Sequence, residues 1–199
     1  MILPIVAYGA PILKKEAEEI DEDYKNLDEL IANMFETMYE ASGVGLAAPQ
    51  IDKSIRLFIV DASPFAEDED GNEDPDPKAA GLKGFKKIFI NPIIEEETGE
   101  EWAFAEGCLS IPNIREEVMR KEKIKISYYD ENWEFHEEEY DGFAARIIQH
   151  EYDHIEGILF TDHLSPLKKR MLKKKLVNIS KGETDVNYRM KFPAQKRRR

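Results

Sequence analysis

The chain has 199 residues, of which 42% are hydrophobic, with a net charge of −13 and one cysteine, Cys108. This length and apolar content suit one domain with a sizeable core, exclude wholesale disorder, and leave no internal disulfide possible. No apolar run approaches the roughly 18 residues of a membrane span, and the start lacks the basic segment of an export signal, so we expect a cytoplasmic protein.

The first predicted element is a helix over Leu27–Ala41, in which apolar residues recur every three or four positions. Asn26 and Glu29 resemble a capping box at its start, and Gly43 is a plausible stop. Segments rich in β-branched and aromatic residues then predict short strands. These strands are expected at Ile55–Val60, Lys87–Ile90, Ile124–Tyr129 and Trp133–Glu139.

Two further helices are predicted, one over Asp141–Gly157 and one that opens at Ser165 and Pro166 and runs to about Ser180. The Asp-, Glu-, Pro- and Gly-rich segment Ala66–Gly84 is expected to be a surface insertion, because it holds little apolar surface to bury. We expect one domain over 1–182 and a basic, disordered tail over 183–199.

The strongest local motif is His150-Glu151-Tyr152-Asp153-His154. Helix positions i and i+4 lie one turn apart on the same face, so two imidazoles there can bind one metal ion. Glu151, beside the first ligand, can then reach a water on the metal. The alternative is a pair of partly buried helix histidines with no metal.

A catalytic metal site needs a third protein ligand and one open position. Cys108, which follows a glycine in Glu106-Gly107-Cys108-Leu109-Ser110, is the leading candidate, although a lone cysteine is more often a core residue. The other candidates fit less well. Phe160 stands where one metallopeptidase pattern needs a histidine, and the remaining candidates are badly spaced or lie in a strand: Glu156, His163, Glu183 and His136.

A third motif, Gly43-Val-Gly-Leu-Ala-Ala-Pro-Gln50, permits tight turns and offers a side-chain amide, although glycine turns after helices are routine. Together with Glu106–Ser110 and Gln149–His154, it closely resembles the three signature motifs of the peptide deformylase family. The resemblance spans most of residues 1–180. It implies an α+β fold with short, mostly antiparallel strands around a central metal-binding helix and a basic C-terminal helix.

The resemblance also implies an activity, which is removal of the formyl group from the N-terminal formylmethionine of new polypeptides. Hydroxide on the metal attacks the formyl carbon, and Glu151 acts as general base and then acid. Cys108, His150 and His154 bind one divalent ion, most often Fe²⁺ in the family, with Zn²⁺, Ni²⁺ or Co²⁺ as alternatives. The remaining implied site residues are the oxyanion donors Gln50 and Leu109, the methionine pocket Val44, Phe104, Phe143 and Ile147, the backbone contact Gly45, and Arg115 at the pocket mouth, where a plain surface role is equally consistent.

The partners implied are N-formylmethionyl nascent peptides, with neither a membrane nor DNA. Residues 165–199 carry 13 Lys and Arg against Glu183 and Asp185, so the basic helix is a candidate for docking on ribosomal RNA, unless it is only a solvated helix. Two alternatives from other classes remain at this point. One is a metallopeptidase of the His-Glu-x-x-His type, and the other is a non-enzymatic metal-containing RNA-binding module.

Overall fold

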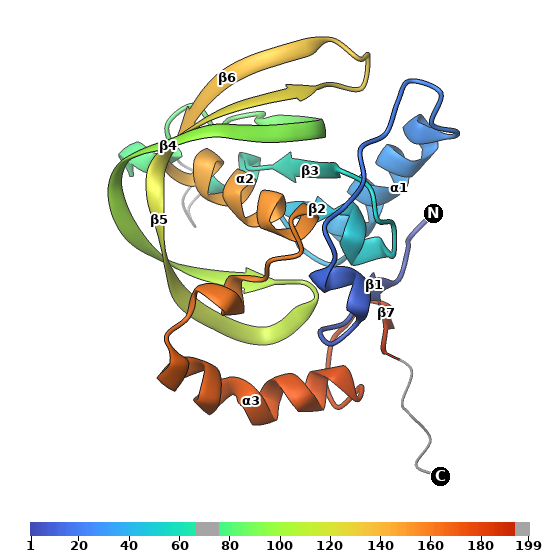
Figure 1. Cartoon of the computed structure of the whole chain (residues 1–199), viewed down its shortest axis with the longest axis vertical. Coiled ribbons are helices and arrows are strands. Elements are labelled where there is room, and N and C mark those ends of the chain that lie inside the picture. The colour runs from blue at the N-terminus through green and yellow to red at the C-terminus, as the bar shows by residue number, and fades with distance from the viewer. Residues whose placement is uncertain (67–75, 194–199) are drawn as a thin grey trace.

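The computed structural model describes residues 1–66 and 76–193. Within them, three α-helices pack with a five-stranded sheet and a small two-stranded sheet. In Figure 1, helix α2 (Gly142–Ile155) lies at the centre, inside the curve of the long strands β4 (Lys86–Cys108) and β5 (Ile111–Tyr129). The predicted α+β class, with mostly antiparallel strands around a central helix, is confirmed.

The strands of the larger sheet lie in the order β2-β3-β4-β5-β6, and each pair of adjacent strands is antiparallel. Its outer strands are β2 (Gly45–Ala47) and β6 (Phe135–Asp141), and β3 (Leu57–Asp61) lies between β2 and β4. Four register shifts interrupt the β4–β5 pairing, and such irregularities bend a hairpin. The bent hairpin therefore curves around α2, and Cys108, which precedes its closing turn Leu109–Ser110, lies 3.3 Å from His154 near the C-terminal end of the helix.

Helix α1 spans Leu27–Glu40 and packs its apolar stripe, including Ile31, Met34 and Met38, against β2 and β3. The predicted capping box is absent, because Asn26 is left-handed and its side chain makes no cap bond. At the other end Ser42 takes the left-handed conformation, and the Gly43 N–H donates to the Met38 carbonyl. Gly43 is needed for space, since an added Cβ would lie 2.8 Å from Leu109 Cδ1.

Helix α3 spans Pro166–Ser180 as predicted, and the Ser165 side chain accepts a bond from the Lys168 N–H. Its buried residues, Leu172, Leu176 and Ile179, pack beneath the β4–β5 hairpin (Figure 1). No helix in residues 1–66 or 76–193 has the length and apolar character to cross a membrane.

The structure describes parts of both predicted irregular segments: the expected surface insertion is anchored by a few buried residues, and the prediction of a disordered tail is wrong for residues 183–193. Within the expected surface insertion, Ala66, Ala79 and Leu82 are buried against the core around α2, and residues 67–75 lie outside the described part of the chain. The expected disordered tail instead folds back over residues 183–193. There, β7 (Met190–Lys191) pairs in parallel with β1 (Ile5–Val6), while residues 194–199 lie outside the description.

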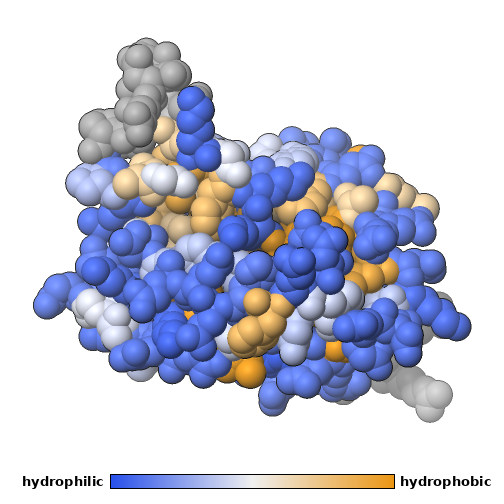
Figure 2. Space-filling model, turned by 90° about the horizontal axis from the view of Figure 1, so that it is seen from above, coloured by the Kyte–Doolittle hydropathy of each residue, from blue (hydrophilic) through white to orange (hydrophobic). Residues whose placement is uncertain are grey.

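The remaining short elements are 3-10 helices, which connect the strands and helices. They span Pro11–Lys14, Ala48–Ile51, Ser63–Phe65, Pro77–Ala79 and Phe160–His163. Figure 2, which views the molecule from above, shows a mostly hydrophilic face on which hydrophobic residues gather in smaller patches between charged ones.

Candidate metal centre

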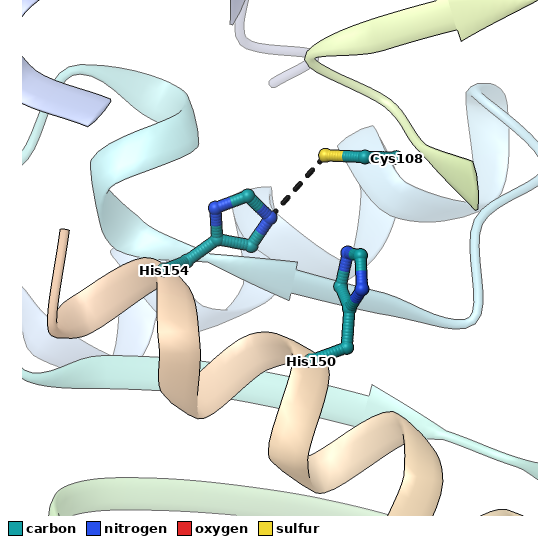
Figure 3. Close-up of side chains that lie close together, drawn as sticks. All are labelled: Cys108, His150 and His154. Atoms are coloured by element: carbon teal, nitrogen blue, oxygen red, sulfur yellow. Dashed lines mark hydrogen bonds between the residues drawn. The ribbon is translucent and has the colours of Figure 1, made fainter. Parts of the chain in front are cut away.

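Three potential metal ligands converge where the β4–β5 turn meets α2. His150 and His154 project from the same side of the helix, one turn apart, and Cys108 faces them from the end of β4 (Figure 3). The Cys108 Sγ lies 3.3 Å from His154 Nε2, and one ligand atom of each residue lies within 4.8 Å of the others. The structure therefore brings the three sequence-predicted ligands together.

The donor set fits a tetrahedral metal ion. Metal–sulfur and metal–nitrogen bonds of roughly 2.3 and 2.0 Å at tetrahedral angles separate sulfur and nitrogen by about 3.5 Å, close to the observed distance. Burial by itself would raise the pKa of the Cys108 thiol, but His154 and His150 lower it to about 5. The sulfur is therefore a thiolate at neutral pH, which is the form that binds metals.

A buried carboxylate holds the first histidine in place. Glu106 accepts two bonds from Arg120, at 2.7 and 3.0 Å, and one from Arg146 at 3.0 Å. Its Oε2 lies 2.9 Å from His150 Nδ1, so the opposite ring nitrogen, Nε2, is left for a metal. Burial would raise the pKa of the Glu106 carboxyl, but His150 and Arg120 hold its pKa far below the usual range.

Sequence reasoning missed this charged cluster, although Arg146 precedes His150 by four residues and so shares its helix face. Arg120 also binds Asp153 at 2.8 Å, and Asp153 in turn contacts His163 at 2.7 Å. His163 therefore serves this network, while His136 contacts Asp130 on the β5–β6 hairpin. Neither belongs to the group formed by Cys108, His150 and His154.

Glu151 is buried beside His150 and lines the cavity. Its carboxylate packs against Gly45, where any side chain would overlap it, so the glycine in β2 makes room for this acid. Burial raises the pKa of Glu151 to about 7. Its Oε2 is buried and has no hydrogen-bond partner among the described residues, as expected of an atom that awaits a water or a substrate.

Gln50 and the β4–β5 turn border the candidate metal centre on the side of Cys108. The Gln50 Oε1 accepts a bond from the Ala47 N–H at 2.8 Å, which orients the amide. Its Nε2 then lies 3.5 Å from Cys108 Sγ and 3.3 Å from Ser110 Oγ. The side-chain N–H group of Gln50 therefore faces the candidate metal centre, beside Leu109.

A cavity of about 940 Å³ opens onto these groups. Val44, Phe104 and Ile147, which the family resemblance assigns to a pocket, line it, while the Phe143 ring packs against Phe104, with centroids 5.5 Å apart. Phe65, which the sequence analysis did not single out, also lines the cavity, and its ring stacks on Phe143 at 5.2 Å. These aromatic and aliphatic side chains give this part of the cavity an apolar lining.

The mouth of the cavity holds one predicted residue and one unforeseen segment. Arg115 is exposed there and lies over Gly107, where an added Cβ would come within 3.3 Å of Arg115 Cγ. The unforeseen segment is 185–188, which follows α3 and lines the same cavity. The composition of segment 185–188 does not indicate that it lines a cavity, because its position depends on the pairing of β7 with β1.

Comparison with known proteins agrees with this geometry. A model of the family described as "Polypeptide deformylase" matches residues 2–170. The chain belongs to the peptide deformylase family. Relatives named peptide deformylase include those of Christiangramia forsetii, 61% identical over the full length of both chains, and Flavobacterium psychrophilum, 59% identical over 99% of this chain and 100% of that protein.

Solved structures show the same fold. A peptide deformylase from Plasmodium falciparum superposes with a TM-score of 0.75 at 35% identity, covering 89% of this chain and 95% of the other. The Thermotoga maritima enzyme gives 0.71 at 37% identity, covering 83% and 99%. As a member of this metal-dependent family, the protein is an enzyme that removes the N-formyl group from new polypeptides. Family membership therefore replaces the metallopeptidase and the non-enzymatic RNA-binding module as explanations.

Proposed function

We propose that Cys108, His150 and His154 hold one divalent metal ion, at which the chain hydrolyses the formyl amide of N-formylmethionyl peptides. The observation that carries this proposal is the convergence of the lone thiolate on two helix imidazoles, with Sγ 3.3 Å from His154 Nε2. When bound, the metal supplies a Lewis acid that makes water acidic enough to react near neutral pH. Three protein ligands leave the fourth position open for this chemistry.

Glu151 moves the protons of the reaction. It accepts a proton from the attacking water and delivers it to the departing amine as the formyl C–N bond breaks, so that formate and a free amino terminus are produced. A raised pKa of about 7 supports this role, because such a carboxyl both takes and gives a proton near neutrality. Gly45 supports it also, since the glycine leaves room for the carboxylate.

Gln50 and Leu109 stabilise the oxyanion that forms on the formyl oxygen. The Gln50 amide nitrogen lies 3.5 Å from Cys108 Sγ, and Leu109 follows the cysteine directly, so both donors border the candidate metal centre. Donors fixed in advance act strongly in a site that excludes water. The bond from the Ala47 N–H to Gln50 Oε1 supplies that fixing for the amide.

Substrate choice rests on the cavity. Val44, Phe104 and Ile147 receive the methionine side chain, with Phe143 supporting Phe104 from behind. The backbone at Gly45 contacts the peptide, which lies along the edge of β2, an outer strand of the sheet. Arg115 stands at the mouth, where its guanidinium contacts residues that follow the methionine.

The metal in the cell is ferrous iron, and the enzyme works in the cytoplasm. One thiolate and two imidazoles suit Fe²⁺, and they also suit Zn²⁺, Ni²⁺ and Co²⁺. The family resemblance favours iron among these. Absence of a membrane-spanning helix from the described residues is consistent with a cytoplasmic location.

The basic helix α3 docks the enzyme on the ribosome. Lys173, Lys174 and Lys175 are exposed, and none of them has a salt bridge among the described residues. Several exposed lysines without acidic partners on one helix are suited to contacts with RNA phosphates. Such contacts weaken as the salt concentration rises.

An assay of the purified protein, loaded anaerobically with ferrous iron, tests the proposed activity and its selectivity. Formyl-Met-Ala-Ser and acetyl-Met-Ala-Ser serve as matched substrates that differ by one methyl group. We expect release of formate from the first and no measurable acetate from the second, because the space at the metal is small. Equal hydrolysis of both peptides, or cleavage of the Met-Ala bond, would contradict the proposal.

A further inference from the structure

The turn that closes the β4–β5 hairpin depends on both ends of the chain. Cys108 pairs with Ile111, so Leu109 and Ser110 form the turn and their carbonyl groups lie outside the strand ladder. The Ser110 carbonyl accepts a bond from the Tyr8 N–H at 2.9 Å, just after β1. The Leu109 carbonyl accepts one from the Tyr188 hydroxyl at 2.8 Å, just before β7.

The main chain on either side of Tyr188 is itself held by hydrogen bonds. The carbonyl of Asp185 accepts a bond from Asn113 Nδ2 at 3.0 Å, and the carbonyl of Arg189 accepts one from the Ile5 N–H at 2.9 Å. Strands β1 and β7 lie side by side in Figure 1, so this small sheet places its two donors on adjacent carbonyls of one turn. Burial raises the pKa of the Tyr188 phenol to about 12, so the hydroxyl stays protonated and donates at neutral pH.

We propose that Tyr188 is a positioning residue for deformylation, which fixes Leu109 through its carbonyl so that the Leu109 N–H meets the oxyanion. The inference rests on the proposed role of Leu109 as a donor. It extends the working site to residue 188, beyond the part of the chain that the family model matches, 2–170. The bond to the Leu109 carbonyl fixes the peptide plane between Leu109 and Ser110, which limits rotation about Leu109 and thereby the direction of its N–H, and small displacements of a catalytic group cost much rate.

The test compares Tyr188→Phe with Tyr128→Phe and wild type, each loaded with one zinc ion per chain. Tyr128 also donates its hydroxyl to a partner, Glu138, but at the far end of β5 from the turn. We expect Tyr188→Phe to lower kcat on formyl-Met-Ala-Ser about ten-fold with KM within about two-fold, as for a contact made in the transition state. Tyr128→Phe should keep the wild-type kcat.

Two readouts separate positioning from general damage. The metal content of Tyr188→Phe should stay at one ion per chain, and the amide resonances of Leu109 and Ser110 in its ¹⁵N spectrum should shift, whereas in Tyr128→Phe they should not. A kcat for Tyr188→Phe within two-fold of wild type, equal losses in both variants, or a loss explained by missing metal would overturn the inference. Failure of wild type to deformylate the peptide would instead refute the proposed function.

Discussion

Helices α2 and α3 have nearly the same length, 14 and 15 residues, but they contribute to the molecule in opposite ways. Twelve residues of α2 are buried, and they include the polar side chains of Arg146, His150, Glu151 and His154. In α3 only Leu172, Leu176 and Ile179 are buried, and its lysines face outward. Buried polar groups are costly unless they are paired, so those of α2 each need a partner or a chemical task.

Charged residues therefore have different roles in the two helices, because those of α2 are buried and those of α3 are exposed. In α2, Arg146 and His150 contact Glu106, while Glu151 and His154 face the candidate metal centre. In α3, the exposed Lys173, Lys174 and Lys175 contribute little to folding. Substitutions of the buried polar residues of α2 and their partners should therefore change catalysis or stability, and substitutions of the exposed lysines of α3 should change only association with a partner.

The largest expected effect is on turnover, from Glu151→Gln. Removing a general acid–base group typically lowers a rate by about 10² to 10⁴, and the isosteric amide leaves the packing against Gly45 intact. We expect kcat to fall within that range while metal content and melting temperature stay near wild type. Steady-state kinetics on formyl-Met-Ala-Ser and metal analysis check this outcome.

A matched control is Glu156→Gln, at the end of the same helix, where the carboxylate contacts Arg56 and does not line the cavity. That variant should keep kcat within about two-fold, since most changes away from a site have small effects. If Glu151→Gln retained a tenth of the wild-type kcat, another group would have to carry the proton.

The next effect is on stability, from Glu106→Gln. The substitution leaves the buried Arg146 without its anion and Arg120 with Asp153 as its remaining anion, and breaking a buried ion pair costs about 3–5 kcal/mol. Urea unfolding of the metal-free proteins at pH 7 should show a loss in this range. The half-exposed Glu138, which pairs with Lys87, is the control, and Glu138→Gln should cost about 1 kcal/mol or less.

The same variant predicts a pH dependence. The pKa of Glu106 in the folded protein lies below its ordinary value of 4.5, so its contribution is fully present above pH 4.5 and is lost as the pH falls. The difference in unfolding free energy between wild type and Glu106→Gln should therefore shrink as the pH falls from about 5 to about 3, and part of it should persist at pH 3 because the pKa in the folded protein is lower still. A difference that stayed constant over that range would show that Glu106 is not held ionised by its partners.

The smallest effect on the enzyme itself is expected in α3. Replacing Lys173, Lys174 and Lys175 together with Gln should leave kcat/KM unchanged and stability within about 0.5 kcal/mol. Co-sedimentation of this variant with ribosomes should nevertheless weaken, and wild-type binding should decline as salt rises. Equal sedimentation of the two proteins would end the docking proposal and leave α3 as a solvated helix.

Local periodicity was enough to predict the helices and the pair of histidines. The i, i+4 spacing of His150 and His154 guarantees a shared face once the segment is helical, and the apolar stripe of α1 is equally local. Cys108 could be predicted as the third ligand only by elimination and by the family resemblance. Its separation of 42 residues from His150 says nothing by itself about where the two side chains lie.

Long-range arrangements were missed for physical reasons. Strands β4 and β5 continue through charged, half-exposed residues. In this bent hairpin apolar and polar residues alternate poorly, so the sequence pattern gives only weak evidence for a strand. Glu106, Arg120 and Arg146 come from three separate segments of the chain and meet only in the folded protein. In the sequence, each of them looks like an ordinary surface charge. Tyr188 lies in a tail that composition marks as disordered, and it is held at the cavity by long-range contacts of that tail, including the pairing of β7 with β1 and the hydrogen bonds to Leu109 and from Asn113.

The central claim is that one sulfur and two imidazoles bind a single ion with a position left open. X-ray absorption on the zinc-loaded protein measures this ligand set directly. We predict one sulfur neighbour at about 2.3 Å and the remaining neighbours, all nitrogen or oxygen, at about 2.0–2.1 Å. Because Cys108 is the sole cysteine, a spectrum of the loaded protein with no sulfur neighbour would contradict the account.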